Sequence, residues 1–189
     1  MALNSAQVAS LTTSQVVALD TAQVAAIETA DFRAMTGTQV AVLSSAQTEA
    51  LSAQQVAAIT TANIRVLTTE ALSALDSTQI AALTTAQANA LTTAQVANLS
   101  TEQLQAIETA DLAAMSAAQV VSMGATLAAA LTTDQVQALT TAQAAALTTA
   151  QVVALSTEQV ANLETADLRA MSSTQFTALT SDQVVSLTA

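Results

Sequence analysis

Residues 83–107 read LTTAQANA-LTTAQVAN-LSTEQLQA-I, three copies of one eight-residue unit followed by the start of a fourth. A large aliphatic residue opens each copy, and this spacing holds without insertion or deletion from Leu3 to Leu187, giving 23 consecutive octads. A fixed short period is typical of repeat architectures, in which each unit packs only on its neighbours. We therefore expect residues 1–189 to form a single repeat array without a central globular core.

The octad carries a recurrent signal for the start of a helix. With the large aliphatic residue as position 1, position 2 is Asn, Thr, Ser, Asp or Gly in all but three copies, and these residue types cap helix N-termini. Position 5 is Gln in 17 of the 23 octads, so that Thr84–Gln87 and many counterparts match the capping box S/T-x-x-E/Q. The motif predicts a helix start in each octad, with a kink or a degenerate copy where Met123-Gly124 breaks the pattern.

The remaining positions separate into an apolar and a polar set. Position 6 is apolar in every octad except at Thr48, and it lies three residues before the next position 1. Residues at this spacing share one face of a helix, so positions 1 and 6 are expected to form the core. Phe32 and Phe176 occupy position 6 and are expected to be buried. Positions 4 and 7 accept charged residues such as Glu102 and Arg65, and are expected to face water.

These patterns predict an all-α fold, a solenoid or superhelix of very short helices with one helix per octad. Each helix is expected to span about six residues, roughly 9 Å, from position 3 to the next position 1. A β-solenoid is one alternative because eight is even, but a period of two would place positions 1 and 6 on opposite faces. A long coiled helix or a disordered chain is another. In a continuous helix, eight residues rotate about 80° beyond two turns, so the Leu stripe would wind around it.

Three octads depart from the consensus in the same way, with Glu at position 2 and Asp at position 5. Two carboxylates at this spacing are a candidate Ca²⁺ site. The other interpretation is a variant cap, in which the following Thr (Thr29 in the first copy) supplies the hydroxyl and the acids favour the helix N-terminus. The second interpretation is preferred because calcium loops need more oxygen ligands than two carboxylates provide. The pairs are Glu28 with Asp31, Glu108 with Asp111, and Glu164 with Asp167.

The composition excludes several function classes. The chain has no Cys, His, Lys, Trp, Tyr or Pro, and its only cations are Arg33, Arg65 and Arg169. We therefore expect no catalytic, cofactor-binding or metal-ligating residues, no cofactor and no enzymatic activity. The net charge of −11 would repel nucleic acid. Polar residues interrupt every octad, so no apolar run reaches the roughly 20 residues of a membrane span, and no membrane insertion is expected.

The LTTAQVAAL-type tandem octad resembles repeats of very large, acidic bacterial surface or secreted proteins of the adhesin-like or RTX-like kind. The resemblance extends over essentially the whole chain. The glycine-rich calcium nonapeptide of RTX repeats is missing, so it does not imply calcium-driven folding. The resemblance implies an extracellular or cell-surface location and a segment of a longer polypeptide.

Three functional interpretations remain open from the sequence. The first is a non-enzymatic spacer or stalk, whose partners are neighbouring repeats of a longer chain and whatever protein or surface its flanking domains bind. The apolar residues at both ends, which further repeats would cover, favour it. The second is an ice-binding module, because Thr recurs at positions 2 and 3 at constant spacing. The third is a protein-recognition scaffold that uses a face of the solenoid.

Overall fold

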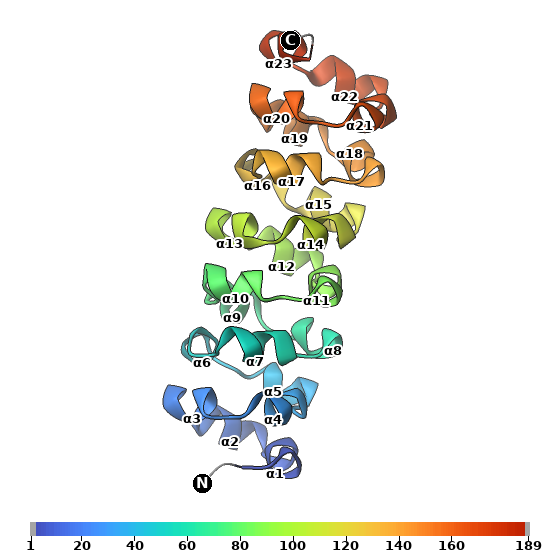
Figure 1. Ribbon diagram of the computed structural model, residues 1–189. Helices are drawn as coiled ribbons and strands as arrows, with labels where there is room; N and C mark the ends of the chain where they lie inside the picture. The colour runs from blue at the N-terminus through green and yellow to red at the C-terminus, as the bar shows by residue number, and fades with distance from the viewer. Residues whose placement is uncertain (1–2, 188–189) are drawn as a thin grey trace.

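The computed structural model describes residues 3–187, and every octad in this range forms one short α-helix (Figure 1). The helices are α1 (Ser5–Ser10), α2 (Thr13–Ala18), α3 (Thr21–Ala25), α4 (Thr29–Arg33), α5 (Gly37–Val40), α6 (Ser45–Glu49), α7 (Ala53–Ala58), α8 (Thr61–Ile64), α9 (Thr69–Ser73), α10 (Ser77–Ala81), α11 (Thr85–Ala90), α12 (Thr93–Ala97), α13 (Thr101–Ala106), α14 (Thr109–Ala114), α15 (Ala117–Ser122), α16 (Gly124–Ala130), α17 (Thr133–Gln137), α18 (Thr141–Ala146), α19 (Thr149–Ala154), α20 (Thr157–Ala161), α21 (Thr165–Ala170), α22 (Ser173–Ala178) and α23 (Ser181–Ser186). The predicted all-α class is confirmed. The β-solenoid and the continuous helix are both wrong, because residues 3–187 contain no strand and the helix is interrupted in each octad. No helix in this range is long and apolar enough to cross a bilayer.

The capping box starts most of these helices, as the sequence predicts. In α12, the Thr92 hydroxyl accepts a hydrogen bond from the Gln95 N–H at 3.1 Å, and Gln95 Oε1 accepts one from the Thr92 N–H at 2.8 Å. All 17 octads with Gln at position 5 form this box within the described chain. Helices other than α16 begin at position 3 and end at positions 6 to 8. The predicted end at position 1 is therefore at least one residue too late.

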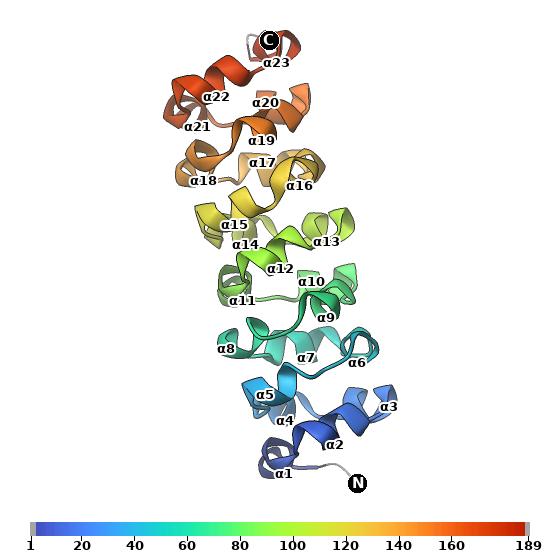
Figure 2. The ribbon, with the colours of Figure 1, turned by 180° about the vertical axis from the view of Figure 1, so that it is seen from behind.

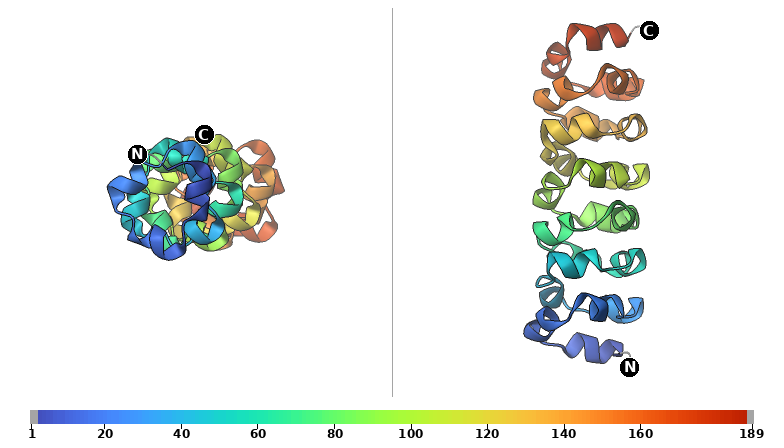
Figure 3. Two further views of the ribbon diagram at one scale, coloured as in Figure 1. Left: turned by 90° about the horizontal axis from the view of Figure 1, so that it is seen from below. Right: turned by 90° about the vertical axis from the view of Figure 1, so that its left-hand side faces the viewer.

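The helices wind into a right-handed superhelix that forms a straight rod (Figures 1 and 2). Each helix packs on the helix three places later, so that α1 contacts α4 and α4 contacts α7. About three octads therefore complete one turn, and successive turns stack along the axis. Residues near the N-terminus and the C-terminus lie at opposite ends of the rod, and the view along the axis shows how narrow it is (Figure 3).

The core is a continuous apolar column made by positions 1 and 6. Leu91 at position 1 is 4% exposed, and Val96 at position 6 is fully buried. Position 4 is exposed in all the octads described, and position 7 is never buried, as predicted. Burying each Leu or Val side chain contributes about 1.5–3 kcal/mol. A single octad buries few such side chains, so the helices depend on the turns above and below.

The two apolar positions face opposite directions along the axis. In the last turn, position 6 is open to solvent: Phe176 is 46% exposed, although Val8 at the other end is fully buried. Position 1 shows the reverse gradient, with Leu3 at 41% and Met35 at 4% exposure. Position 6 is therefore covered by the following turn and position 1 by the preceding turn. The prediction of a buried Phe176 is wrong for this reason, whereas the prediction for Phe32 is confirmed at 1% exposure.

The Gly124 octad is the one described copy that starts without an extended position 2. Met123 has φ −59° and ψ −25°, and Gly124 adopts φ +67°, a left-handed conformation that favours glycine. No side chain caps α16. The expected irregularity is therefore present as a degenerate copy, in which a glycine redirects the backbone between α15 and α16.

The facing of the octad positions can be tested with two substitutions in the same octad, residues 91–98. Leu91→Asp places a carboxylate in the column and is expected to lower the free energy of unfolding by about 4 kcal/mol or more. Ala97→Arg changes an exposed position 7 and is expected to alter it by no more than about 0.5 kcal/mol. Urea denaturation followed by circular dichroism measures both. Equal losses in the two variants would contradict the assignment of faces.

Candidate functional site

A buried polar contact recurs along the axis, made by the side-chain amides of position 5. Gln95 Nε2 donates to the carbonyl oxygens of Ile64 and Leu67, each at 2.8 Å, which lie 31 and 28 residues earlier. Position-5 Gln residues repeat one or both of these bonds through most of the described chain, and we call this set the glutamine ladder. Its members are Gln39, Gln47, Gln55, Gln79, Gln87, Gln95, Gln103, Gln119, Gln135, Gln143, Gln151, Gln159, Gln175 and Gln183.

Each ladder amide serves two helices at once. Its oxygen accepts from the N-cap N–H of its own octad, and its nitrogen donates to carbonyls at and just after the C-terminal end of a helix four octads earlier, where backbone carbonyls lack an i+4 partner. A buried amide with these bonds leaves no donor or acceptor unsatisfied. Gln151 is the one ladder member without the bond to a carbonyl 28 residues earlier, which would be that of Met123 in the irregular octad, and it donates instead to the carbonyls of Val120 and Val121.

The sequence contained a signal for this role that the capping box alone does not explain. Glu fits a capping box as well as Gln does, and an acid is favoured near a helix N-terminus. Nevertheless, position 5 is never Glu in a chain with 14 acidic residues. A carboxylate has no N–H to donate to a carbonyl. The absence of Glu from position 5 therefore reflects the donor side of the amide, a role that the capping motif did not predict.

The three acidic octads replace the ladder amide with a buried Asp. Asp111 is 4% exposed, and its Oδ1 accepts a hydrogen bond from the Thr85 hydroxyl at 2.7 Å. The Ser5 hydroxyl donates to Asp31 in the same way. Asp167 is 1% exposed, and its Oδ2 is buried without a hydrogen-bond partner. In the first two octads, Asp contacts a hydroxyl of an earlier turn and supplies no donor to the ladder.

The two carboxylates of an acidic pair, considered from the sequence as a calcium site, lie in different environments. Glu28 is exposed whereas Asp31 is buried, and residues 3–187 contain no group of three His, Cys, Asp or Glu residues that could hold a metal ion. The variant-cap interpretation is half right. Asp31 lies in the first turn of α4 as expected, but the N-cap residue is Glu28, and no side chain caps the helix. The predicted hydroxyl cap by Thr29 is therefore wrong.

One exposed acid has a perturbed ionisation. The backbone N–H of Glu102, followed by the hydroxyls of Ser100 and Thr101, donates hydrogen bonds to the Glu102 carboxylate and holds its pKa below the usual value. A lowered pKa in the folded state favours folding above the ordinary pKa of Glu, and this contribution is lost as the pH falls. The carboxylate is at the surface near the start of α13, so its hydrogen bonds stabilise only the first turn of that helix.

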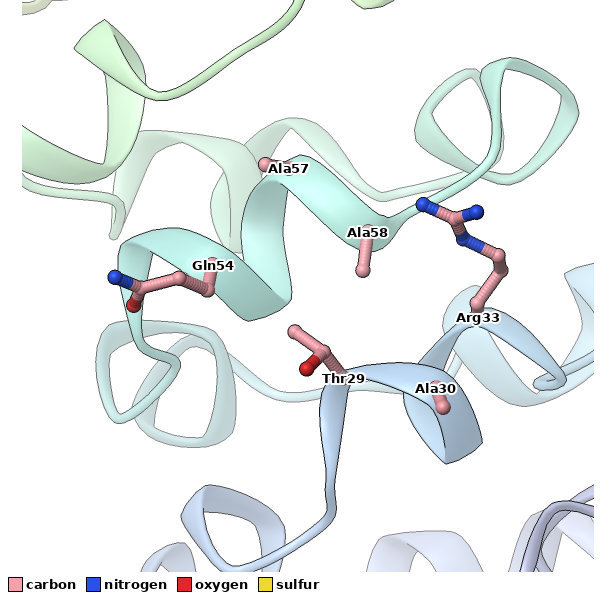
Figure 4. Close-up of a pocket in the computed structure, with 6 residues that line it drawn as sticks. All are labelled: Thr29, Ala30, Arg33, Gln54, Ala57 and Ala58. Atoms are coloured by element: carbon pink, nitrogen blue, oxygen red, sulfur yellow. The ribbon is translucent and has the colours of Figure 1, made fainter.

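Shallow grooves separate the turns on the outside of the rod. The groove between α4 and α7 has Arg33 at one end and Gln54 at the other, with small side chains between them (Figure 4). Its lining residues are Thr29, Ala30, Arg33, Gln54, Ala57 and Ala58. The Thr29 hydroxyl has no base in this lining to remove its proton. The groove therefore offers a surface for contact and no set of groups for nucleophilic catalysis.

The octad pattern corresponds to a known repeat. The model of the ALTTAQ repeat matches residues 1–27, 24–61, 57–85, 74–101, 104–141, 137–165 and 160–189. The chain belongs to the ALTTAQ repeat family. The hexapeptide ALTTAQ itself stands at residues 82–87, 90–95, 138–143 and 146–151, and it runs from position 8 to position 5 of the next octad. It thus contains the buried Leu, the N-cap Thr and the ladder Gln. No curated protein and no solved structure matches the chain.

Because the ALTTAQ glutamine acts as a donor only where an earlier turn lies beneath it, the cost of replacing it with Glu is expected to depend on its position in the rod. Gln95→Glu keeps the capping box but sets a carboxylate against the carbonyls of Ile64 and Leu67. We expect a loss of about 3–5 kcal/mol in the free energy of unfolding. Gln15→Glu makes the same change where the side chain is exposed and its nitrogen has no partner among residues 3–187, so we expect a change within about 0.5 kcal/mol. Urea denaturation distinguishes the two, and similar losses would refute the donor role.

Restoring the consensus in an acidic octad is expected to stabilise the array. The double change Glu108→Thr and Asp111→Gln supplies a hydroxyl cap and an amide in register with the carbonyls of Ile80 and Leu83. The expected gain is about 1–2 kcal/mol. Glu108→Thr alone adds only the cap and serves as the control. A double variant no more stable than this control, measured by urea denaturation, would contradict the role given to the amide.

Proposed function

We propose that this ALTTAQ array is a non-enzymatic spacer or stalk in a longer bacterial surface or secreted polypeptide. The observation that supports it best is the glutamine ladder, which repeats the same turn-to-turn contact along the rod. A rod built this way keeps its two ends at a fixed distance, and the ends lie at opposite extremes of the molecule (Figure 3). A rod of this kind holds apart the segments of the polypeptide that flank it.

The outer surface supports this role. Ala is the commonest residue at positions 4 and 7, which otherwise carry polar residues and a few valines, and 11 of the 14 acids are exposed, as the burial pattern of residues 3–187 indicates. Small neutral side chains supply little contact energy, and a net charge of −11 favours solubility and opposes lateral association. The chain also lacks the His, Cys and Lys side chains used in most acid–base and nucleophilic catalysis. The extracellular or surface location rests on the resemblance to acidic bacterial repeat proteins.

A spacer must be stiff, and stiffness can be measured because the chain has no native Cys. Spin labels on pairs of exposed position-4 alanines about a whole number of turns apart, Ala22→Cys with Ala46→Cys, Ala94→Cys or Ala118→Cys, are expected to give narrow distance distributions by electron–electron resonance. The mean distance should rise linearly with the number of octads between the labels. A flexible chain would instead give broad distributions that grow as about the square root of separation, and this result would exclude a rigid spacer.

The location is tested with the single variant Ala94→Cys. In intact source cells, a membrane-impermeant maleimide is expected to label this exposed position without lysis. Labelling that appears only after lysis would contradict the surface assignment while leaving the rod itself unaffected. Wild-type protein, which has no thiol, is the control for background reaction.

A further inference from the structure

Asp167 carries a buried carboxylate for which the described chain provides no ion pair. The residue is 1% exposed, and its Oδ2 atom has no hydrogen-bond partner. In the other acidic octads a hydroxyl 26 residues earlier donates to the Asp, as Thr85 does to Asp111 at 2.7 Å. The counterpart of Thr85 is Thr141, and no hydrogen bond joins it to Asp167 within residues 3–187. A buried charge is costly unless it is paired, so a positive partner would stabilise Asp167.

Asp167 stands at the register position from which ladder amides donate to carbonyl oxygens. By the offsets of 31 and 28 residues, the carbonyls opposite it are those of Val136 and Leu139. The Leu139 N–H donates to the Val136 carbonyl at 3.2 Å, and the ladder targets Leu72 and Leu75 are joined in the same way at 3.1 Å. The two carbonyls opposite Asp167 are therefore arranged as ladder acceptors, and no side-chain amide of the described chain donates to them.

Asn63 shows where a short side chain at position 5 lies. Asn has the same shape as Asp, and Asn63 Nδ2 donates to the Met35 carbonyl, 28 residues earlier, at 2.7 Å. Asp167 has an oxygen in place of that nitrogen, and a carboxylate cannot donate a hydrogen bond to a carbonyl. A carboxylate in the place of the Asn63 amide sets oxygen against oxygen. A cation between the two oxygens is attracted to both.

We propose that Asp167, with the carbonyl oxygens of Val136 and Leu139, binds a monovalent cation of the size of potassium. The charge follows from the single buried carboxylate, because a divalent ion would leave a buried positive charge uncompensated. The exposed Glu164 of the same acidic pair takes no part. The site therefore differs from the calcium site that paired carboxylates would form, and it does not depend on the spacer role.

The size of the ion follows from the spacing of the ladder carbonyls. Gln143 Nε2 lies 2.8 Å, 3.4 Å and 2.8 Å from three carbonyl oxygens of the turn that it contacts. An ion in the equivalent place would be too far from these oxygens for Mg²⁺, which requires about 2.0–2.1 Å, or for Ca²⁺, which requires about 2.3–2.6 Å. Backbone carbonyls can replace the hydration shell of potassium, as they do in potassium channels.

The dependence of stability on potassium tests the proposal. Urea denaturation of the 189-residue chain is followed by circular dichroism in about 0.5 M KCl, NaCl or choline chloride, so that the ionic strength is constant. The equilibrium constant of unfolding is expected to be about sixfold lower in KCl than in choline chloride, as a Kd of about 0.1 M would give. NaCl is expected to have a smaller effect. Equal stability in the three salts, or equal effects of KCl and NaCl, would overturn the assignment.

Matched variants locate the site. Asp167→Asn supplies an amide that can donate to a carbonyl as Asn63 does, so this variant is expected to fold and to be equally stable in KCl and in choline chloride. Asp111→Asn makes the same change where the Thr85 hydroxyl already contacts the side chain, and it is expected to keep the potassium dependence of the wild type. Loss of the dependence in both variants, or in neither, would overturn the assignment to Asp167.

Direct binding is measured with thallium(I), a monovalent ion close to potassium in size whose nucleus is observed by NMR. The wild-type chain is expected to shift and broaden the resonance of thallium(I) nitrate, and an excess of potassium nitrate is expected to reverse the change. The Asp167→Asn chain is expected to leave the resonance unchanged. An equal change with this variant would indicate general attraction to the acidic surface and would overturn the site.

Discussion

The fold depends on the side-chain amide of the position-5 Gln, which forms hydrogen bonds with the ends of two different helices. A six-residue helix is unstable by itself in water, and most of its backbone groups are the unpaired ones of its termini. The position-5 Gln bonds the N-terminus of its own helix and two carbonyls that end a helix four octads earlier. Local capping and long-range packing are therefore made by the same side chain, although Gln7, Gln15 and Gln23 form their capping boxes without the second contact.

This coupling explains the strict period. Because each ladder amide must meet carbonyls 31 and 28 residues earlier, a one-residue insertion would shift the following amides out of register. Duplication of whole octads preserves these offsets. The acidic blocks around Asp31, Asp111 and Asp167 are separated by whole numbers of octads, as such duplication requires. The repeat count is thus free to change while the repeat length is fixed.

The sequence predicts local structure here far better than it predicts the relation between turns. Helix starts, the exposure of positions 4 and 7, and burial at Leu91 follow from capping and periodicity, which act within one octad. The second bond of Gln95 was missed, because nothing within an octad specifies which turn adjoins it. Burial of Phe176 failed for a related reason, since position 6 is covered only by the turn that follows. The handedness of the superhelix also arises between turns.

The distribution of charge gives the rod different properties along its axis and around it. Eleven of the 14 acidic side chains are exposed in the described structure, whereas the contacts between turns consist mainly of amides, carbonyls and aliphatic groups. Two rods that approach side by side bring like charges together. Charge repulsion at the sides therefore disfavours lateral packing of arrays, and the largely neutral contacts between turns hold each rod together along its axis.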